Sequence, residues 1–529
     1  MKTYLDHGKK MEERIGALLG LEGQRGMPTA YAEFMKLDHW LRKIIGVNLP
    51  LVLSDDYEHF MAVLPGKEYA AQQVIVRKMI GGFTTVAGYW KWLEFLSQRI
   101  TRDKVELVAD FFSGKHNGHP RQFNKDFWLK NADENDGYIP VRVEMVGEGA
   151  TFTGVPFPVA QIYGKTPAVW LNEPMYIQIG HLTYVATIAA QFAAVLGDPW
   201  RFIEVAFRAL QNCEGSDDLL LAMLIGGGII STSNDLGAFI NGAPFKCSGT
   251  TGHCWYQQFP TLKEALRTLL GSPLGPYSTV LLDPYEHKHG FKELQEVLAE
   301  GYPAPFAERP DSGDTLKLGM NDLTALQDEG KEINVIFEDG KKPADVLEAE
   351  KVRRQYGLEE KRAIHGAGGA FLGQRGQLET AYKACYFHDG TPRDRRNEID
   401  TMKICLDDPM KQSLPGMIQW FQNQKTGMYM IGTGDDRAPE GYGYVGDVLY
   451  DGLSVPGKPI FNIGYDPENL AQSVAVKNGV SRSKKIRELL GPSFTLQIGA
   501  NKAAIGMTKS LRRKRKDIYN RALEIVSKK

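Results

Sequence analysis

The sequence of 529 residues predicts an α/β fold in which a (β/α) barrel of the TIM type is joined to an α+β domain. Between about residues 200 and 390, eight short apolar runs alternate with segments of helical periodicity, and each run ends in Gly, Asp, Ser or a charged residue. Strand–helix alternation indicates a parallel sheet, and eight units favour a closed barrel. Residues 138–162 instead alternate apolar and polar side chains, as half-buried antiparallel strands do.

The apolar runs that we assign to barrel strands lie at 204–210, 227–234, 243–253, 278–287, 304–314, 333–340, 363–371 and 380–390. Helix candidates between them include TLKEALRTLL, FKELQEVLAE and KPADVLEAEKVRRQYG. Barrel enzymes place their sites at the carboxyl ends of the strands, where the loops converge on one opening. The polar residues at these ends are therefore candidates for a site, although any one of them can simply mark a loop.

Domain boundaries follow from the same patterns. We expect a helical N-terminal extension over 1–48, the first part of the α+β domain over 49–200 and the barrel over 201–400. Residues 401–500 read as strands that return to the α+β domain, and 501–529 as a basic helix. A solvated surface helix is the simplest interpretation of this tail, and a nucleic-acid contact is the alternative.

Composition excludes several classes of function. The chain has 63 basic and 64 acidic residues, so its net charge of −1 makes no argument for nucleic acid or an anionic membrane as partner. Its five cysteines include no C-x-x-C pair, which is typical of a reducing compartment. The N-terminus lacks a secretory signal, and the apolar stretch 219–230 is too short to span a bilayer. We expect a cytoplasmic protein.

A glycine-rich segment, GAGGAF, follows the seventh predicted strand. Gly366, Gly368 and Gly369 would let backbone N–H groups approach an anion closely, as phosphate-binding loops do. Arg375 and Lys383 lie just beyond and add positive charge. A purely structural turn is the alternative.

Carboxylates end three successive predicted strands: Asp283, Asp311 with Asp314, and Asp339. Converging carboxylates can bind ribose hydroxyls, hold Mg²⁺ through its waters, or stabilise a cationic ribose C1. Helix N-capping is the alternative for each of them. Arg309 would share a face of its strand with Asp311 and meet an anionic group.

His253 closes the third run beside a Gly/Thr turn, where a neutral imidazole is a candidate nucleophile toward a phosphoryl donor. A packing or surface role is the alternative. His287 and His289 have the appearance of metal ligands, but no third ligand has an obvious position in the sequence. The identity of any protein-bound metal therefore stays open.

Taken together, these motifs resemble the nicotinate and nicotinamide phosphoribosyltransferases over about residues 50–420. The resemblance is carried by SDDY (54–57), IVR (75–77), IPVRVEMVGEG, RPDSGD, FEDG, GAGGAF, the pair Tyr382–Lys383 and the KI…DDPMKQSLPG run. It implies an irregular barrel plus an α+β domain from both ends of the chain, and a homodimer with shared active sites. The substrates that it implies are nicotinate, phosphoribosyl pyrophosphate and ATP, with Mg²⁺ as cofactor.

The resemblance also implies residue roles. Tyr57 would stack on the pyridine ring and Arg77 would touch phosphate, both across the dimer interface. Arg309 would face the base, Asp311 the ribose, and His253 would be phosphorylated by ATP. The remaining phosphate and ribose contacts would come from Asp339, Gly340, the glycine-rich segment, Arg375, Lys383, Lys403 and Lys411.

Ser233 bears on the choice between acid and amide. The STSN and GTTGH elements are similar to those of nicotinate enzymes, whereas nicotinamide enzymes carry Asp where Ser233 stands. A carboxamide N–H₂ needs an acceptor such as Asp, whereas a carboxylate is repelled by one. We therefore favour nicotinate. The wording of SDDY–IVR and RPDSG is closer to the nicotinamide branch, which keeps nicotinamide as the alternative.

The sequence departs from the family at the first barrel strand. The expected F-G-x-R element appears as VAFRAL, so Phe207 and Arg208 have open roles as the second face of the base stack or as a phosphate ligand. A catalytically weakened, nucleotide-binding homologue is therefore a further alternative.

Overall fold

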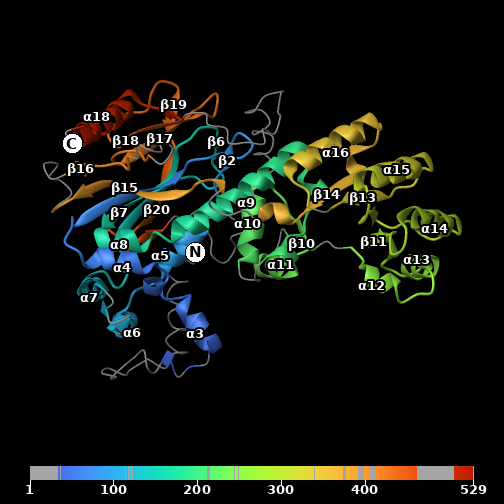
Figure 1. Cartoon of the computed structure of the whole chain (residues 1–529), viewed down its shortest axis with the longest axis horizontal. Coiled ribbons are helices and arrows are strands. Elements are labelled where there is room, and N and C mark those ends of the chain that lie inside the picture. Colours follow the sequence, from blue (N-terminus) through green and yellow to red (C-terminus); the bar gives the residue numbers. More distant parts are fainter. Residues whose placement is uncertain are drawn as a thin grey trace. The chain divides into compact units, whose positions relative to one another are not determined.

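The structure is a computed structural model of the chain. It describes residues 34, 35, 37, 39–113, 115–116, 119–120, 123–210, 215–242, 245–247, 250–338, 340–372, 377–390, 398–404, 412–461 and 505–527. They divide into two compact units (Figure 1). Those within Met1–Tyr184, Gln374–Ser473 and Gly499–Lys529 form the first unit, and those within Val185–Gly373 form the second.

The second unit is built on a parallel sheet of seven strands in the order β10-β9-β8-β14-β13-β12-β11. The strands are β8 (Phe202–Glu204), β9 (Ser231–Thr232), β10 (Lys246–Cys247), β11 (Thr279–Leu281), β12 (Ala307–Arg309), β13 (Asn334–Phe337) and β14 (Ala363–Ala367). The strands are short because each apolar run contains only a few residues before the polar loop begins. The described strands of this sheet pair in parallel with their neighbours, as the strand–helix alternation predicts.

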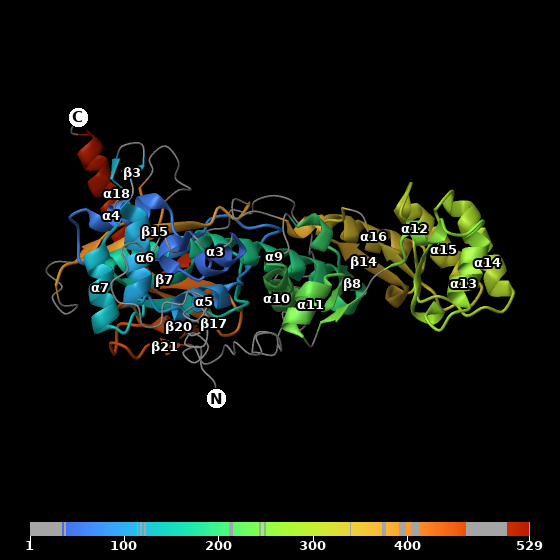
Figure 2. The ribbon, with the colours of Figure 1, turned by 90° about the horizontal axis from the view of Figure 1, so that it is seen from below.

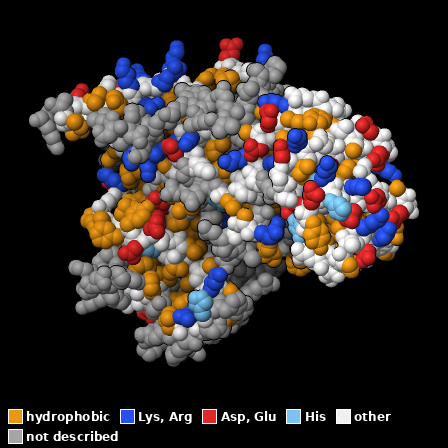
Figure 3. All heavy atoms as spheres, turned by 45° about the vertical axis from the view of Figure 1, so that its right-hand side comes forward, with side chains coloured by type: hydrophobic (Ala, Val, Ile, Leu, Met, Phe, Trp, Pro, Cys, Tyr) orange, Lys and Arg blue, Asp and Glu red, His pale blue; other side chains and the backbone are white. Residues whose placement is uncertain are grey.

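Helices connect these strands: α10 (Ser216–Gly227), α11 (Asp235–Asn241), α12 (His253–Tyr256), α13 (Leu262–Leu270), α14 (His287–Ala299), α15 (Thr315–Asp328) and α16 (Pro343–Gln355). The apolar faces of α13 and α14 bury Leu266, Leu294 and Val297 in one core cluster. The two helices lie side by side (Figure 2). Thr261 caps α13 and Asp314 caps α15, so the capping interpretation holds for Asp314. Acidic and basic side chains are interspersed over the part of the surface at the right of Figure 3.

Each of the first seven runs assigned to the barrel overlaps a strand of the parallel sheet, although the run 204–210 shares only Glu204 with β8. The assignment of the eighth run, 380–390, is wrong. That run forms β15 (Ala381–His388), which pairs antiparallel with β1 (Tyr69–Val76) in the first unit. An apolar run shows that a strand is buried but does not show which strand is its partner. Among the described residues, β10 and β11 do not pair with each other, so the parallel sheet is a curled half-barrel rather than a closed one.

The main sheet of the first unit is antiparallel and combines both ends of the chain. Its order is β16-β15-β1-β7-β5-β20-β21. The early segment supplies β1, β5 (Val141–Val146) and β7 (Phe157–Lys165), and the late segment supplies β15, β16 (Ile399–Asp400), β20 (Gly446–Asp451) and β21 (Ile460–Phe461). Residues 138–162 thus form antiparallel strands as their alternation predicts, and the segment after 400 returns to the same sheet.

Smaller sheets complete this unit. One has the order β19-β17-β18-β22, and the others are the pairs β2–β6 and β3–β4. Their bounds are β2 (Thr84–Thr85), β3 (Lys115–His116), β4 (His119–Pro120), β6 (Thr151–Phe152), β17 (Ile418–Asn423), β18 (Tyr429–Thr433), β19 (Tyr442–Tyr444) and β22 (Gly506–Met507). The helices are α3 (His39–Gly46), α4 (Asp56–Val63), α5 (Tyr89–Ser97), α6 (Arg102–Ser113), α7 (Lys125–Glu134), α8 (Thr166–Leu171) and α18 (Lys509–Ser527).

The basic tail forms α18, and one face of it packs on the first unit. Leu511 is fully buried, Lys514 lies 2.6 Å from a carboxylate oxygen of Asp400, and Arg515 donates a hydrogen bond to Gln412. Two of the basic side chains of the tail, Lys514 and Arg515, are therefore bonded to other residues of the first unit. Of the predicted N-terminal extension, residues 1–33 lie outside the described residues.

The helix α9 (Met175–Leu196) contributes residues to both units and is apolar on all sides. The stretch Thr166–Leu196 that contains it is long and apolar enough to cross a membrane, but 94% of its most apolar window is buried inside the protein. Burial of this kind is typical of a core helix. This stretch is longer than 219–230, which the sequence offered as an example of its longest apolar segments.

Candidate active site at the carboxyl edge of the parallel sheet

A cavity of about 720 Å³ lies in the second unit, where the parallel strands end. Loops that follow five of the seven strands line it, and so does the loop that leads into α12. Nine residues predicted from the sequence line this cavity: Phe207, Arg208, Ser233, His253, Arg309, Asp311, Gly340, Gly368 and Gly369. The parallel sheet thus brings together residues that are far apart in the chain.

His253, the first residue of α12, is held by a carboxylate that follows β11. Its Nε2 lies 2.9 Å from Oδ1 of Asp283, and Ser312 donates a hydrogen bond to the other oxygen of Asp283. Burial raises the pKa of Asp283, but the hydrogen bonds from Ser312 and His253 and the charge of the imidazole outweigh it, so the pKa is lowered overall. Asp283 is therefore ionised at neutral pH and fixes the orientation of the imidazole.

Arg309, at the end of β12, lies between two carboxylates. One guanidinium nitrogen is 2.9 Å from Asp311, and another donates a 2.6 Å hydrogen bond to Glu338. The other nitrogen of His253, Nδ1, is 3.7 Å from Asp311. His253, Asp283, Asp311, Arg309 and Glu338 thus form one chain of charged groups along the cavity wall, with Arg309 only 8% exposed.

Glu338 lines the cavity but was not predicted from the sequence. Within FEDG, the residue predicted to reach the site was Asp339. Phe337 packs in the core cluster beneath α15, and side chains alternate along a strand. Glu338 therefore faces the other side, toward Arg309. The alternation of side chains along the strand could therefore have identified Glu338 as a site residue. Asp339 itself lies outside the described residues.

The glycine-rich segment also lines the cavity through Gly368 and Gly369, and its three predicted glycines differ in what surrounds them. A Cβ on Gly366 would lie 2.6 Å from Cγ of Glu338, and one on Gly368 would lie 2.5 Å from the carbonyl oxygen of Val205. A Cβ on Gly369 would meet nothing within 4 Å. Gly366 and Gly368 are thus required by packing, whereas Gly369 faces open space in the cavity.

Ser233 follows β9, and its backbone N–H donates a 2.8 Å hydrogen bond to the carbonyl oxygen of Glu204. The Glu204 carboxylate accepts hydrogen bonds from Thr232 and from the backbone of Ala206. Burial raises the pKa of Glu204 although both hydrogen bonds lower it. This network fixes the loops on which Ser233, Phe207 and Arg208 stand. Arg208 itself is exposed.

Four predicted site residues belong to the first unit and not to the loops of the parallel sheet. Tyr57 lies on α4 and is 45% exposed, and Arg77 follows β1 and is buried. Lys383 does not end a barrel strand as predicted, because it lies within β15 opposite Gln73. Lys403 is exposed. Arg375 and Lys411, like Asp339, lie outside the described residues.

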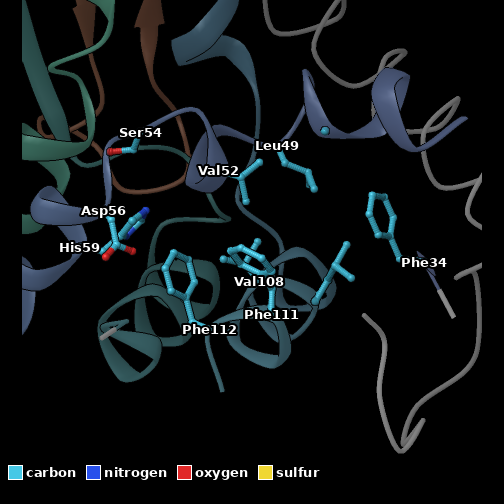
Figure 4. Close-up of a pocket in the computed structure, with 11 residues that line it drawn as sticks. Phe34, Leu49, Val52, Ser54, Asp56, His59, Val108, Phe111 and Phe112 are labelled. Atoms are coloured by element: carbon cyan, nitrogen blue, oxygen red, sulfur yellow. The ribbon is translucent and has the colours of Figure 1, made fainter. Parts of the chain in front are cut away.

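A second cavity, of about 540 Å³, lies in the first unit between α4 and α6 (Figure 4). Its lining is mostly apolar and aromatic, with Leu49, Phe111 and Phe112 among its residues and His59 at one side. Burial lowers the pKa of His59, so this imidazole is neutral at pH 7. None of the predicted site residues lines this cavity.

The chain is a mixed α/β protein. It combines a parallel sheet, with charged loops at its carboxyl edge, and an antiparallel sheet built from both ends of the chain. Comparison of the sequence with family models and with curated proteins finds no match. Comparison of the structure shows the fold of human nicotinic acid phosphoribosyltransferase, with 18% identity and a TM-score of 0.58 over 88% of this chain and 99% of that one.

The same fold is found in a nicotinate-nucleotide pyrophosphorylase from Pyrococcus furiosus, with 15% identity and a TM-score of 0.56 over 83% of this chain and 96% of that one. The resemblance read from the motifs is thus confirmed as a likeness to nicotinate phosphoribosyltransferase structures. At this level of identity the likeness establishes the fold.

Proposed function

We propose that the protein is a phosphoribosyltransferase of NAD metabolism that joins nicotinate to the ribose of phosphoribosyl pyrophosphate and releases pyrophosphate. The observation that carries the proposal is the cavity itself, in which the His253–Asp283 pair, the Arg309–Asp311 pair and the glycine-rich segment face one space. The fold shared with solved structures of nicotinate enzymes supports the same activity.

The glycine-rich segment is the proposed phosphate site. Gly369 leaves open space beside its backbone, so the phosphate oxygens of the substrate can approach its amide. Arg208, an exposed residue of the cavity lining, adds a positive charge that forms no ion pair among the described residues. Pyrophosphate needs such donors because its negative charge increases as the bond to ribose C1 breaks.

Asp311 is the proposed partner of the ribose. Its carboxylate faces the cavity and is 27% exposed, so it can accept hydrogen bonds from ribose hydroxyls and stabilise positive charge at C1. The pyridine nitrogen then attacks C1 as pyrophosphate leaves. Few proton transfers are needed, and most of the rate enhancement comes from positioning and charge stabilisation.

Ser233 and Phe207 are the proposed contacts of nicotinate. A serine hydroxyl can donate to a carboxylate, and a half-buried phenyl ring can pack on the pyridine. Nicotinamide stays the alternative substrate, because Glu338 and Asp311 supply acceptors near the same cavity. Tyr57, Arg77 and Lys383 would complete the site across the interface of a cytoplasmic homodimer, as the resemblance implies.

His253 is the proposed site of phosphorylation by ATP. A neutral imidazole that donates Nε2–H to Asp283 carries its lone pair on Nδ1, the nitrogen on the side of Asp311. Nδ1 would attack the γ-phosphorus of ATP, and ADP would leave. Hydrolysis of the phosphohistidine would then drive synthesis of the mononucleotide.

Mg²⁺ fits this site best through its own waters. Asp283 already accepts from His253 and Ser312, and both Asp311 and Glu338 accept from Arg309. Mg²⁺ dehydrates reluctantly and commonly combines one or two carboxylates with substrate phosphates. When bound, Mg²⁺ would neutralise charge on pyrophosphate. Asp311, whose carboxylate faces the cavity, would hold it through a water molecule.

The test is a side-by-side assay of the purified protein with phosphoribosyl pyrophosphate and either nicotinate or nicotinamide, each with and without ATP. We expect nicotinate mononucleotide and pyrophosphate in equal amounts, and faster formation with ATP. Equal or better use of nicotinamide would overturn the substrate assignment. Binding of phosphoribosyl pyrophosphate without turnover of either base would instead identify a catalytically weakened homologue. This alternative is considered because VAFRAL stands where the family has F-G-x-R.

A further inference from the structure

A second cluster of charged groups lies on the other face of β12 from Arg309. Side chains alternate along this strand, so Glu308 points away from the cavity toward the helices α14 and α15. There it meets His287, the first residue of α14, and Asp322, in the middle of α15. Glu308 is fully buried, and His287 and Asp322 are each 7% exposed.

The geometry of this cluster is that of a ligand set. One nitrogen of His287 and one carboxylate oxygen each of Glu308 and Asp322 all lie within 4.8 Å of one another. His287 Nε2 is 2.5 Å from Asp322. Both carboxylate oxygens of Glu308 are buried and have no hydrogen-bond partner among the described residues.

An unpartnered carboxylate is costly to bury. Glu350, for comparison, is also buried but is bonded to Arg201, Arg353 and His365. In the part of the chain that the structure describes, no Lys or Arg pairs with Glu308.

We propose that His287, Glu308 and Asp322 bind a zinc ion that holds α14 and α15 to β12. Two carboxylates and a neutral imidazole carry two negative charges, which a divalent cation would neutralise. Zn²⁺ accepts this mixture of nitrogen and oxygen ligands, whereas Ca²⁺ and Mg²⁺ prefer oxygen alone. The site is buried behind the strand that carries Arg309, so its role is structural and independent of the proposed transferase activity.

The test measures zinc binding directly on the full-length protein. The protein is dialysed against a chelator and then titrated with ZnCl₂ in a calorimeter, and its bound zinc is measured by mass spectrometry after removal of excess metal. We expect about one equivalent of Zn²⁺ per chain and a rise in unfolding temperature on zinc addition. MgCl₂ at the same concentration should give neither effect.

Variants assign the bound ion to this cluster. Glu308→Gln keeps the shape of the side chain and should lose the bound zinc, and Asp322→Asn should do the same. The matched control is His289→Ala, since His289 lies on the same helix but is exposed and pairs with Glu293 on that helix. This variant should keep the full equivalent.

Two results would overturn the proposal. One is a wild-type protein that takes up no zinc after chelation; this measurement needs no variant to fold. The other is a folded Glu308→Gln protein, with an unchanged circular-dichroism spectrum, that still holds one equivalent. Mononucleotide synthesis plays no part in either result.

Discussion

At the scale of single residues, His253 and Asp283 form the pair on which the proposed ATP coupling depends. The Asp283 carboxylate lies 2.9 Å from Nε2 and orients the imidazole, and it would stabilise the positive charge that the ring gains when Nδ1 attacks phosphorus. Hydrogen bonds to charged groups contribute about 1.5–3 kcal/mol, which corresponds to about a 10- to 100-fold change in rate. The effect should fall on the ATP-dependent step.

We expect Asp283→Asn to lower the ATP-stimulated rate about 10- to 100-fold and to reduce phosphate incorporation at His253 similarly. Labelling with γ-³²P-ATP and an assay of mononucleotide formation measure the two quantities. The rate without ATP should change less. Equal losses with and without ATP would show that Asp283 supports the whole cavity instead of the imidazole alone.

Ser233 is the residue that should control the choice between acid and amide. Ser233→Asp introduces an acceptor for the carboxamide and repels the carboxylate, so we expect the ratio of kcat/KM for nicotinamide to that for nicotinate to rise about tenfold or more. Ser233→Ala is the control, because it removes the hydroxyl donor without adding an acceptor. An unchanged ratio in the Asp variant would place the 3-substituent elsewhere in the cavity.

The loop after β14 permits a comparison at the scale of one element. Gly368→Ala puts a Cβ against the Val205 backbone, so we expect a loss of about 1–3 kcal/mol in the free energy of unfolding. Gly369→Ala adds a methyl group to open space, so its stability should match the wild type.

The two glycine variants should differ in the opposite way in binding. The Gly369→Ala methyl group occupies the cavity beside the proposed phosphate site, and we expect a weaker affinity for phosphoribosyl pyrophosphate by calorimetry. Chemical denaturation measures the stability of both variants. A Gly369→Ala protein with wild-type affinity would exclude this loop as the phosphate site.

Elements of the second unit were predictable because each has a strong local signal. The runs at 278–287, 304–314 and 333–340 each contain an apolar strand followed by a polar loop, and they became β11, β12 and β13. The run at 380–390 has the same local character, but its partners are β1 and β16. Partner choice depends on contacts between distant segments, which a single sequence does not show.

The candidate site was predictable to the extent that it depends on strand ends. His253, Asp283, Arg309 and Asp311 were found because polar residues after parallel strands share one edge of the sheet. The pairing of Arg309 with Glu338 was not found, since it depends on which face each residue of FEDG presents. For the same reason the three-residue cluster around Glu308 was not visible from the spacing of His287 and His289.

At the scale of the whole molecule, the buried cluster of Glu350, Arg201, Arg353 and His365 predicts how the free energy of unfolding changes in acid. Burial raises the pKa of Glu350, but hydrogen bonds from His365 and Arg201 outweigh it and lower the pKa from 4.5 to about 2. A lowered folded-state pKa contributes stability that is full above pH 4.5 and is lost as the pH falls toward 2. Burial lowers the pKa of His365, so its contribution falls in the same direction from about pH 6.5.

We therefore expect the urea midpoint to decrease steadily from pH 6.5 to pH 3. Glu350→Gln should be less stable at pH 7 and should depend less on pH, as followed by tryptophan fluorescence. Glu348→Gln is the control on the same helix, because Glu348 is exposed and its pair with Lys351 contributes little. If Glu350→Gln kept the wild-type pH dependence, other groups would control the acid transition.

The antiparallel sheet that joins both ends of the chain constrains the order of events on the ribosome. When β1 has been made, its neighbour β15 is still to be translated, and the whole parallel sheet lies between them. The middle of the chain is contiguous and can fold as soon as it emerges. The edge of β1 meanwhile stays available to other nascent chains, so the early segment is where a chaperone would be needed most.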